Sequence, residues 1–173
     1  MKIDLADVIS SEGMELSARA EIGLRAFESR LGKLPITEKP PFDLSVRNEG
    51  GGRLSIRGEA SVTVAIPCAR CLEEVARTFR LSIDEEVKLS GAEAGGDPDG
   101  WLDVEGTSLD VDQLIHEEIL VRWPSRVLCK EDCKGICKRC GANLNVASCR
   151  CQPEGTDPRM AAIRDIFKEF KEV

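Results

Sequence analysis

The sequence predicts an α+β protein, with an antiparallel β-sheet and flanking helices followed by a cysteine-rich zinc module near the C-terminus. Three patterns support this prediction. From Phe42 onward apolar and polar residues alternate, which is the period of a half-buried strand. Other stretches place apolar residues at three- and four-residue steps, the spacing of an amphipathic helix. Six of the eight cysteines lie between Cys129 and Cys151.

Pattern divides the 173 residues into three segments. We expect an N-terminal segment with a helix and a proline linker (1–41), an antiparallel β region with a CxxC hairpin and a helix (42–121), and a cysteine-rich metal module with a C-terminal helix (122–173). This length is about that of one domain and allows a core that does not depend on metal for all its stability.

The N-terminal segment predicts a helix from apolar residues at helical spacing. These residues are Leu16, Ala20, Leu24, Phe27 and Leu31. Pro35 would end this helix, and Pro40 and Pro41 would form a stiff extended connector. We expect the segment to pack on the sheet, with contact to a partner as the alternative.

The β region reads as long strands joined by short turns. Phe42, Leu44 and Val46 alternate with polar residues, the glycines at 50–52 form a turn, and a second alternating run ends at Pro67. The CxxC of Cys68 and Cys71 then falls at a hairpin tip. The next strand has as its apolar positions Val75, Phe79, Leu81, Ile83 and Val87.

A loop, a short strand and a helix follow. Residues 90–100 have a flexible composition, and Trp101, Leu102 and Val104 suggest a strand. The spacing of Thr107 and Asp110 is that of a capping box. The helix after it would bury one face formed by Val111, Leu114, Ile115 and Ile119. His116, the only histidine, falls on the polar side of this helix and is expected to be solvated.

The cysteines are the strongest functional signal. Eight thiols without a visible export signal are typical of metal ligands in a reducing compartment. Two four-cysteine zinc sites use all of them. The long-range site would combine two distant pairs, Cys68 with Cys71 and Cys129 with Cys133. The local site would combine Cys137, Cys140, Cys149 and Cys151, with Gly141 providing a bend after the knuckle and Asn143 and Asn145 forming turns.

A redox pair of the thioredoxin type is the alternative for Cys68 and Cys71. That motif places its first cysteine at a helix N-terminus, whereas strand-like sequence surrounds this pair. Iron in place of zinc also stays open.

Charge is distributed unevenly along this acidic chain, whose formal net charge is −7. Residues 84–118 carry twelve acidic residues against one lysine, whereas residues 122–151 carry seven basic residues against two acidic ones. RNA could therefore be contacted only through a local basic patch. The candidate patch consists of Lys130, Lys134, Lys138, Arg139 and Arg150. Alternatively, some of the bases in this region simply neutralise zinc-bound thiolates.

Several functions lack a supporting pattern in the sequence. No window has the 18 to 20 apolar residues of a membrane helix, and MKIDLADVIS does not resemble a signal peptide, so we expect a cytoplasmic protein without a membrane partner. No nucleophile and base arrangement or phosphate-binding glycine motif is visible, so we expect neither an enzyme nor a small-molecule substrate.

The C-terminal tail predicts a last helix. Asp157 would cap it, Pro158 would occupy its first position, and one stripe would contain Met160, Ile163, Phe167 and Phe170. We expect this stripe to pack against the sheet or the zinc module, with docking on a partner as the alternative.

The cysteine motifs and this tail also carry a resemblance. The runs CARCLEEV, DCKGICKRCGANLN, CRC and DPRMAAIRDIFKEF resemble the YceD family, which is linked to accumulation of large-subunit ribosomal RNA in bacteria and plastids. The resemblance extends from about Phe42 to the C-terminus and implies a part in ribosome biogenesis. We therefore expect a non-enzymatic factor whose partner is a ribosomal RNA precursor or a large-subunit assembly protein. The alternatives are a thiol redox protein or sensor, and a structural zinc protein that binds another protein.

Overall fold

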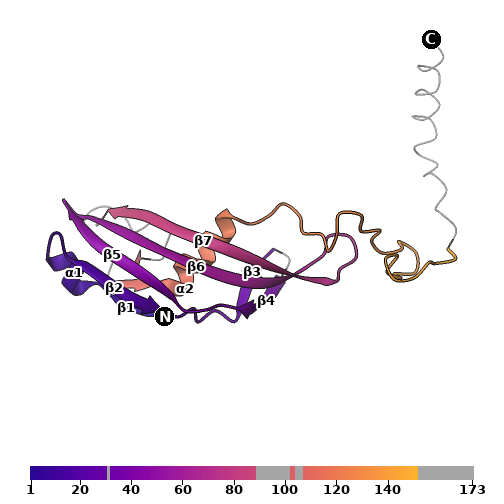
Figure 1. Cartoon of the computed structure of the whole chain (residues 1–173), viewed down its shortest axis with the longest axis horizontal. Helices are drawn as coiled ribbons and strands as arrows, with labels where there is room; N and C mark the ends of the chain where they lie inside the picture. The colour runs from indigo at the N-terminus through magenta and orange to yellow at the C-terminus, as the bar shows by residue number, and fades with distance from the viewer. Residues whose placement is uncertain (31, 89–101, 104–106, 152–173) are drawn as a thin grey trace, which may run out of the picture.

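A computed structural model of the chain describes residues 1–30, 32–88, 102–103 and 107–151 (Figure 1). Its elements follow one another as β1 (Lys2–Asp4), α1 (Ala6–Ser10), β2 (Glu15–Ala20), β3 (Ala26–Ser29), β4 (Gly32–Glu38), β5 (Phe42–Gly50), β6 (Arg53–Pro67), β7 (Glu74–Lys88), β8 (Leu102–Asp103), β9 (Ser108–Asp110) and α2 (Val111–Val121). The described part is therefore mostly antiparallel sheet with two short helices, and of these only α2 corresponds to a helix that the sequence predicts.

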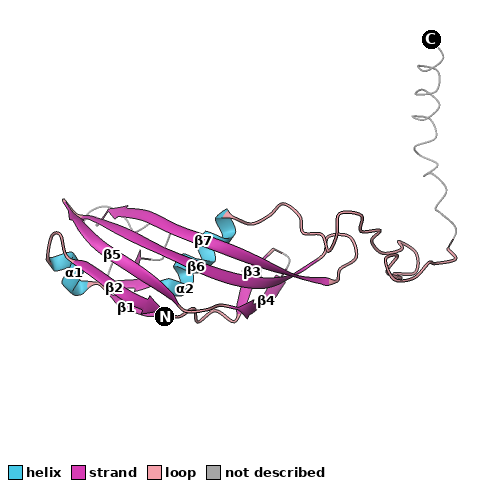
Figure 2. Cartoon of the chain, in the orientation of Figure 1, coloured by secondary structure: helices cyan, strands magenta, loops and turns pink. Residues whose placement is uncertain are grey.

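A six-stranded antiparallel sheet is built around β6. Strand β7 pairs with β6 along its whole length, from Arg53 opposite Lys88 to Pro67 opposite Glu74. The other edge of β6 is shared, because β5 pairs with its first half and β4 with its second half. Strands β2 and β3 extend the sheet beyond β5 and β4. The β6–β7 hairpin thus runs the length of the sheet and carries its turn to one end of it, next to the segment that follows α2 (Figure 2).

The core lies on one face of this curled sheet. The residues that alternate in the sequence of β5, β6 and β7 are buried there, including Val46, Ile56 and Leu81. Helix α1 packs against β5 and helix α2 against β7, and their apolar residues join the same core. The predicted strands, the glycine turn and the CxxC at the hairpin tip are confirmed.

A small second sheet positions helix α2. It has the order β1-β9-β8, and β9 leads directly into the helix. The helix cap is Asp110, whose side chain accepts hydrogen bonds from the backbone N–H groups of Asp112 and Gln113. The predicted cap at Thr107 is wrong because Ser108 and Leu109 pair with β1 instead of starting the helix. The predicted apolar face of α2 is confirmed as buried.

The predicted N-terminal helix is wrong. Where it was expected, the chain forms β2 and β3, and Pro35 lies within strand β4 instead of ending a helix. The stretch fits both periods, since Leu16, Ala18 and Ala20 also alternate. Pairing with β5 satisfies its backbone groups and decides in favour of strand. The segment was expected to pack on the sheet, but it supplies strands β2, β3 and β4 of the sheet itself. Leu31 lies outside the described residues.

His116 is half-buried, whereas the sequence predicts a solvated residue. Its ring lies 4.8 Å from the ring of Phe27, and its Nε2 is 3.4 Å from the backbone oxygen of Glu28. Strand β3 covers this side of α2, a contact that helical periodicity alone does not reveal. Phe27 also stacks on Trp123 at 4.7 Å, and Trp123 stacks on Phe79 at 5.6 Å. This stack holds the chain to the sheet where it leaves α2 toward the cysteines.

Some predictions fall on other parts of the chain. Strand β8 confirms the strand predicted around Leu102, whereas Trp101 and Val104 lie outside the described residues. The loop at 90–100 and the tail helix from Asp157 also lie outside them. The division into three segments stays a prediction. Among the helices that the structure describes, neither combines the length and the apolarity needed to cross a bilayer.

Candidate metal centre

Strands β6 and β7 place the first cysteine pair in their connecting turn. Cys68 follows the end of β6, and its N–H donates to the backbone oxygen of Glu73 at 2.8 Å. The N–H of Leu72 donates to the oxygen of Cys68 at 3.0 Å and closes the turn. Leu72 adopts a φ of 65°, a left-handed conformation that is rare outside glycine. Both cysteines are buried.

Backbone hydrogen bonds join this turn to the chain that follows α2. The N–H of Ala69 donates to the oxygen of Val127 at 2.8 Å, and the N–H of Ile136 donates to the oxygen of Arg70 at 3.1 Å. The Arg70 guanidinium in turn donates to the oxygen of Cys133 at 2.8 Å. Segments that lie about sixty residues apart in the sequence therefore lie side by side (Figure 1).

Gly135 allows this close approach. Its φ of +78° is one that other residues rarely adopt. A Cβ at this position would lie 3.0 Å from the backbone oxygen of Arg70. A larger residue at position 135 would be strained and would push the turn away.

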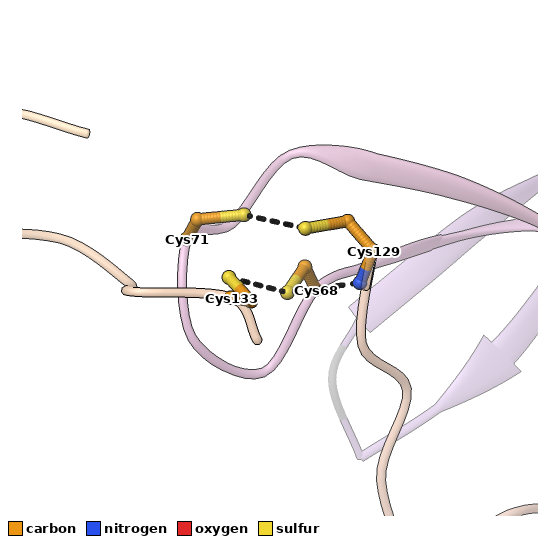
Figure 3. Close-up of side chains that lie close together, drawn as sticks. All are labelled: Cys68, Cys71, Cys129 and Cys133. Carbon is orange, nitrogen blue, oxygen red and sulfur yellow. Dashed lines mark hydrogen bonds between the residues drawn. The ribbon is translucent and has the colours of Figure 1, made fainter. Parts of the chain in front are cut away.

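Four sulfurs meet at this junction, and we call Cys68, Cys71, Cys129 and Cys133 the hairpin cluster (Figure 3). Their sulfurs all lie within 4.8 Å of one another. The Sγ atoms of Cys68 and Cys133 are 3.8 Å apart, and those of Cys71 and Cys129 are 3.5 Å apart. A tetrahedral zinc with Zn–S bonds of about 2.3 Å places its sulfurs about 3.8 Å apart. The donor set and its spacing therefore fit a four-coordinate metal ion.

Hydrogen bonds to sulfur prepare two of these thiols for the charged form. The backbone N–H of Cys71, followed by those of Arg70 and Cys129, lowers the pKa of Cys68 to about 6 against burial. Burial is the largest influence on Cys133 and opposes its ionisation, but the Asn145 amide and the Gly135 N–H keep its pKa below the usual value. Thiolates at these positions are the form that binds metal.

The other two thiols resist ionisation in the absence of a cation. The hydrogen bond to the Cys71 thiol and burial raise the pKa of Cys129 to about 12. Four negative sulfurs at this spacing repel one another, so a cation between them is what would allow all four to ionise.

The second group of sulfurs is local, and we call Cys137, Cys140, Cys149 and Cys151 the loop cluster. Its sulfurs also lie within 4.8 Å of one another. The turn formed by its CxxC has the same backbone hydrogen bond as the CxxC turn at the tip of the β6–β7 hairpin. The N–H of Gly141 donates to the oxygen of Cys137 at 2.9 Å, and Gly141 forms the predicted bend with a φ of +72°. The backbone N–H of Cys140 lowers the pKa of Cys137 to about 6.

Comparison with known proteins identifies the family. Residues 56–167 match the family model described as large ribosomal RNA subunit accumulation protein YceD, a stretch that includes all eight cysteines. The chain belongs to the YceD family. No solved structure matches it significantly.

Three curated relatives illustrate the range of similarity to this YceD-family chain. The uncharacterized protein YlbN of Bacillus subtilis is 30% identical over 62% of the chain and 62% of its own length. The chloroplastic large ribosomal RNA subunit accumulation protein YCED homolog 1 of maize is 26% identical over 68% of the chain and 50% of its own length. An uncharacterized protein of Mycobacterium tuberculosis is 28% identical over 73% of the chain and 61% of its own length. The chain thus spans between half and 62% of these relatives.

The structure groups the eight cysteines of this YceD member into the two sets that the sequence predicts. It also places the predicted RNA-binding side chains on the surface of the same region. All five are exposed: Lys130, Lys134, Lys138, Arg139 and Arg150. The Nζ of Lys130 forms an ion pair with the Oδ1 of Asp132 at 3.9 Å. Lys138 and Arg139 are the two residues between the thiols of the second CxxC.

Three groups of residues at the site were missed from the sequence. Arg70 binds the backbone of the second segment, and no spacing rule distinguishes it from a surface arginine. Asn145, predicted only as a turn former, donates from its amide to the sulfur of Cys133 at 3.3 Å. Large apolar side chains are exposed nearby at Leu72, Ile136 and Val146. A left-handed turn after a CxxC is the one signal that could have suggested that Leu72 is exposed.

Proposed function

We propose that the chain is a non-enzymatic zinc-binding factor that supports the accumulation of large-subunit ribosomal RNA. The observation that carries this proposal is the family match, which includes both four-cysteine clusters. The maize relative is named for large ribosomal RNA subunit accumulation, and its similarity covers 68% of the chain. The reducing cytoplasm predicted from the sequence would keep the thiols available for metal.

Two zinc ions would have a structural part in this proposal. A bound zinc ion would join four thiolates that the fold already brings together. A site with four protein ligands has no open position for a substrate or water, which is the pattern of structural zinc. Cys68, Cys71, Cys129 and Cys133 would attach the segment after α2 to the hairpin, and the loop cluster would fix the knuckle that displays Lys138 and Arg139.

We further propose that RNA is contacted through this cationic end. The chain is acidic overall, so its approach to a phosphate backbone is favourable only where bases gather. The exposed bases of residues 130–150 lie on a segment that metal would hold in place. The sequence from 124 to 151 contains no aromatic residue, so binding should depend on phosphate charge and steeply on salt, with little base stacking.

Binding to large-subunit RNA fragments across a salt series tests this proposal. We expect Lys134→Glu combined with Arg139→Glu to weaken binding and to flatten its salt dependence. The control is Arg19→Glu with Arg53→Glu, two exposed bases of the sheet, which changes the net charge equally. An equal loss of RNA affinity in both double variants would mean that only the overall charge matters. Unchanged affinity in the Lys134→Glu and Arg139→Glu variant would mean that this surface does not bind RNA.

Other outcomes would favour the two alternatives. Undetectable RNA binding at low salt, with retained zinc, would favour a structural zinc protein that binds a protein partner. A disulfide between Cys68 and Cys71 that forms and is reduced reversibly would favour a redox protein. The turn that holds this pair joins two strands, and no helix of the described residues begins there. It therefore lacks the helix N-terminus that activates thioredoxin-type cysteines.

A further inference from the structure

The loop between the two halves of the loop cluster reaches back to the hairpin cluster. Residues 141–148 connect Cys140 to Cys149, so a metal bound by both pairs would hold the two ends of this loop together. The loop folds over the strand-like stretch around Gly135, where the N–H of Leu144 donates to the oxygen of Gly135 at 2.8 Å. Ile136 and Asn143 form an isolated antiparallel bridge. The middle of the loop is thereby placed beside Cys133.

Asn145 makes the contact between this loop and the other cluster. Its Oδ1 accepts a hydrogen bond from the backbone N–H of Lys134 at 2.8 Å. Because that partner can only donate, the Asn145 side chain must turn its oxygen toward it and its amide group toward Cys133. The Nδ2 atom lies 3.3 Å from the Sγ of Cys133. Asn145 therefore links the two clusters. It lies in the loop whose ends the loop cluster holds together, and it donates a hydrogen bond to a sulfur of the hairpin cluster, which makes it a positioning residue.

Asn143 fixes the orientation of Asn145. Its Oδ1 accepts from both the backbone N–H and the side-chain amide of Asn145, each at 2.9 Å. Its own amide donates to the carboxylate of Glu73 in the β6–β7 turn at 2.7 Å. The asparagine pair therefore bridges the hairpin turn and the ligand-bearing segment that faces it.

We propose that Asn145 couples the two metal sites, so that metal bound to the loop cluster raises the metal affinity of the hairpin cluster. With the loop closed by metal, Asn145 is already in place, and the entropy of ordering it does not oppose its bond to sulfur. Hydrogen bonds to ligand atoms change metal affinity by about 10- to 100-fold. By linkage, metal in the hairpin cluster strengthens the loop cluster by the same factor. This inference rests on the metal binding proposed above.

The test follows the release of metal from the hairpin cluster alone. Zinc-loaded protein is titrated with a chelator and alkylated, and mass spectrometry gives the chelator concentration at which Cys68 and Cys71 are half modified. We expect Cys149→Ser with Cys151→Ser to lower this concentration by about tenfold or more. We expect Asn145→Ala to lower it similarly. Adding Asn145→Ala to the double cysteine variant should change it by less than about twofold, because the coupling is already lost.

Two further variants separate coupling from a general structural effect. Val146→Ala alters an exposed neighbour and should leave the half-point unchanged. Asn145→Asp keeps the oxygen that accepts from Lys134 but replaces the donor with a negative charge beside the thiolate. We expect it to release metal at least as easily as Asn145→Ala. Rescue of wild-type retention by Asn145→Asp would overturn the proposal.

The remaining outcomes distinguish the coupling from the metal centre itself. Equal and additive effects of the cysteine and asparagine substitutions would overturn the coupling and leave the metal sites intact, as would wild-type retention in Asn145→Ala. Immediate alkylation of Cys68 and Cys71 in zinc-treated wild-type protein, before any chelator is added, would overturn both the hairpin site and the coupling.

Discussion

The hairpin cluster and the loop cluster have the same local geometry and different structural tasks. Each begins with a CxxC whose fifth residue turns left-handed, and in each the N–H of that residue donates to the oxygen of the first cysteine. The hairpin cluster joins sulfurs separated by 58 and 65 residues. The loop cluster closes within residues 137–151. With metal bound, the same chemistry would attach one segment to the sheet in the first case and would shape a single segment in the second.

The two clusters also differ in burial. Three of the four cysteines of the hairpin cluster are buried, whereas those of the loop cluster are exposed or half-buried. The three buried cysteines of the hairpin cluster form a small group with Val75 and Leu128, separate from the core of the sheet. The sheet should therefore fold without either metal, and the segment after α2 should depend on both.

The largest expected effect is on how much of the chain loses its structure when a ligand of one cluster or the other is removed. Cys68→Ser should release the whole segment 124–151 from the hairpin turn, because the binding energy of a structural metal site is folding energy, here on the order of 5 kcal/mol or more. Cys149→Ser should disturb mainly residues 137–151 and should loosen the hairpin cluster only as far as Asn145 transmits the loss. Hydrogen exchange followed by mass spectrometry measures both. Unprotected strands β5 to β7 in Cys68→Ser would contradict the independence of the sheet.

A smaller effect tests the attachment without touching a ligand. Arg70→Ala removes the guanidinium that binds the backbone oxygens of Cys133 and Glu131. We expect it to lower the stability of the attached segment by about 1–3 kcal/mol. Faster exchange at residues 129–136, with unchanged exchange in the sheet, is the expected observation. Arg77→Ala, an exposed arginine of β7, is the matched control, and an equal effect of both variants would contradict the role of Arg70.

The smallest effect compares the two left-handed turns directly. Leu72→Gly should remove about 1–2 kcal/mol of backbone strain from the folded state. The greater backbone entropy of glycine in the unfolded state should cancel about 0.5–1 kcal/mol of this gain in stability. Leu72 is 63% exposed, so little burial is lost. Gly141→Leu should instead cost about 1–2 kcal/mol at the loop cluster. Denaturant unfolding of the zinc-loaded proteins measures both, and changes of the same sign would contradict the equivalence of the turns.

Much of the candidate site could be predicted because cysteine spacing is local information. The second CxxC and the pair at 149 and 151 lie close enough in sequence to form one site, which leaves Cys129 and Cys133 for the distant pair. The hairpin that carries Cys68 and Cys71 could also be predicted, since apolar residues recur at alternate positions along most of β6 and β7. The contacts of Arg70 and Asn145 were not accessible, because they depend on which surfaces the two segments present to each other.

The fold was predicted less well where the chain meets partners distant in sequence. The stretch from Leu16 to Phe27 fits helical spacing, and only its pairing with β5 and β4 makes it strand. His116 lies on the polar side of α2 by periodicity, yet Phe27 of β3 covers it. In both cases a tertiary contact overrides the local pattern.

Metal content tests the central claim most directly. Protein purified without added metal should contain two zinc ions per chain, and X-ray absorption should show zinc bonded to four sulfurs at about 2.3 Å. Loss of one ion from Cys68→Ser and of one from Cys149→Ser would assign the ions to the two clusters. A single ion shared among the cysteines, an iron–sulfur chromophore, or metal-free protein with disulfides would contradict the account of two structural zinc sites.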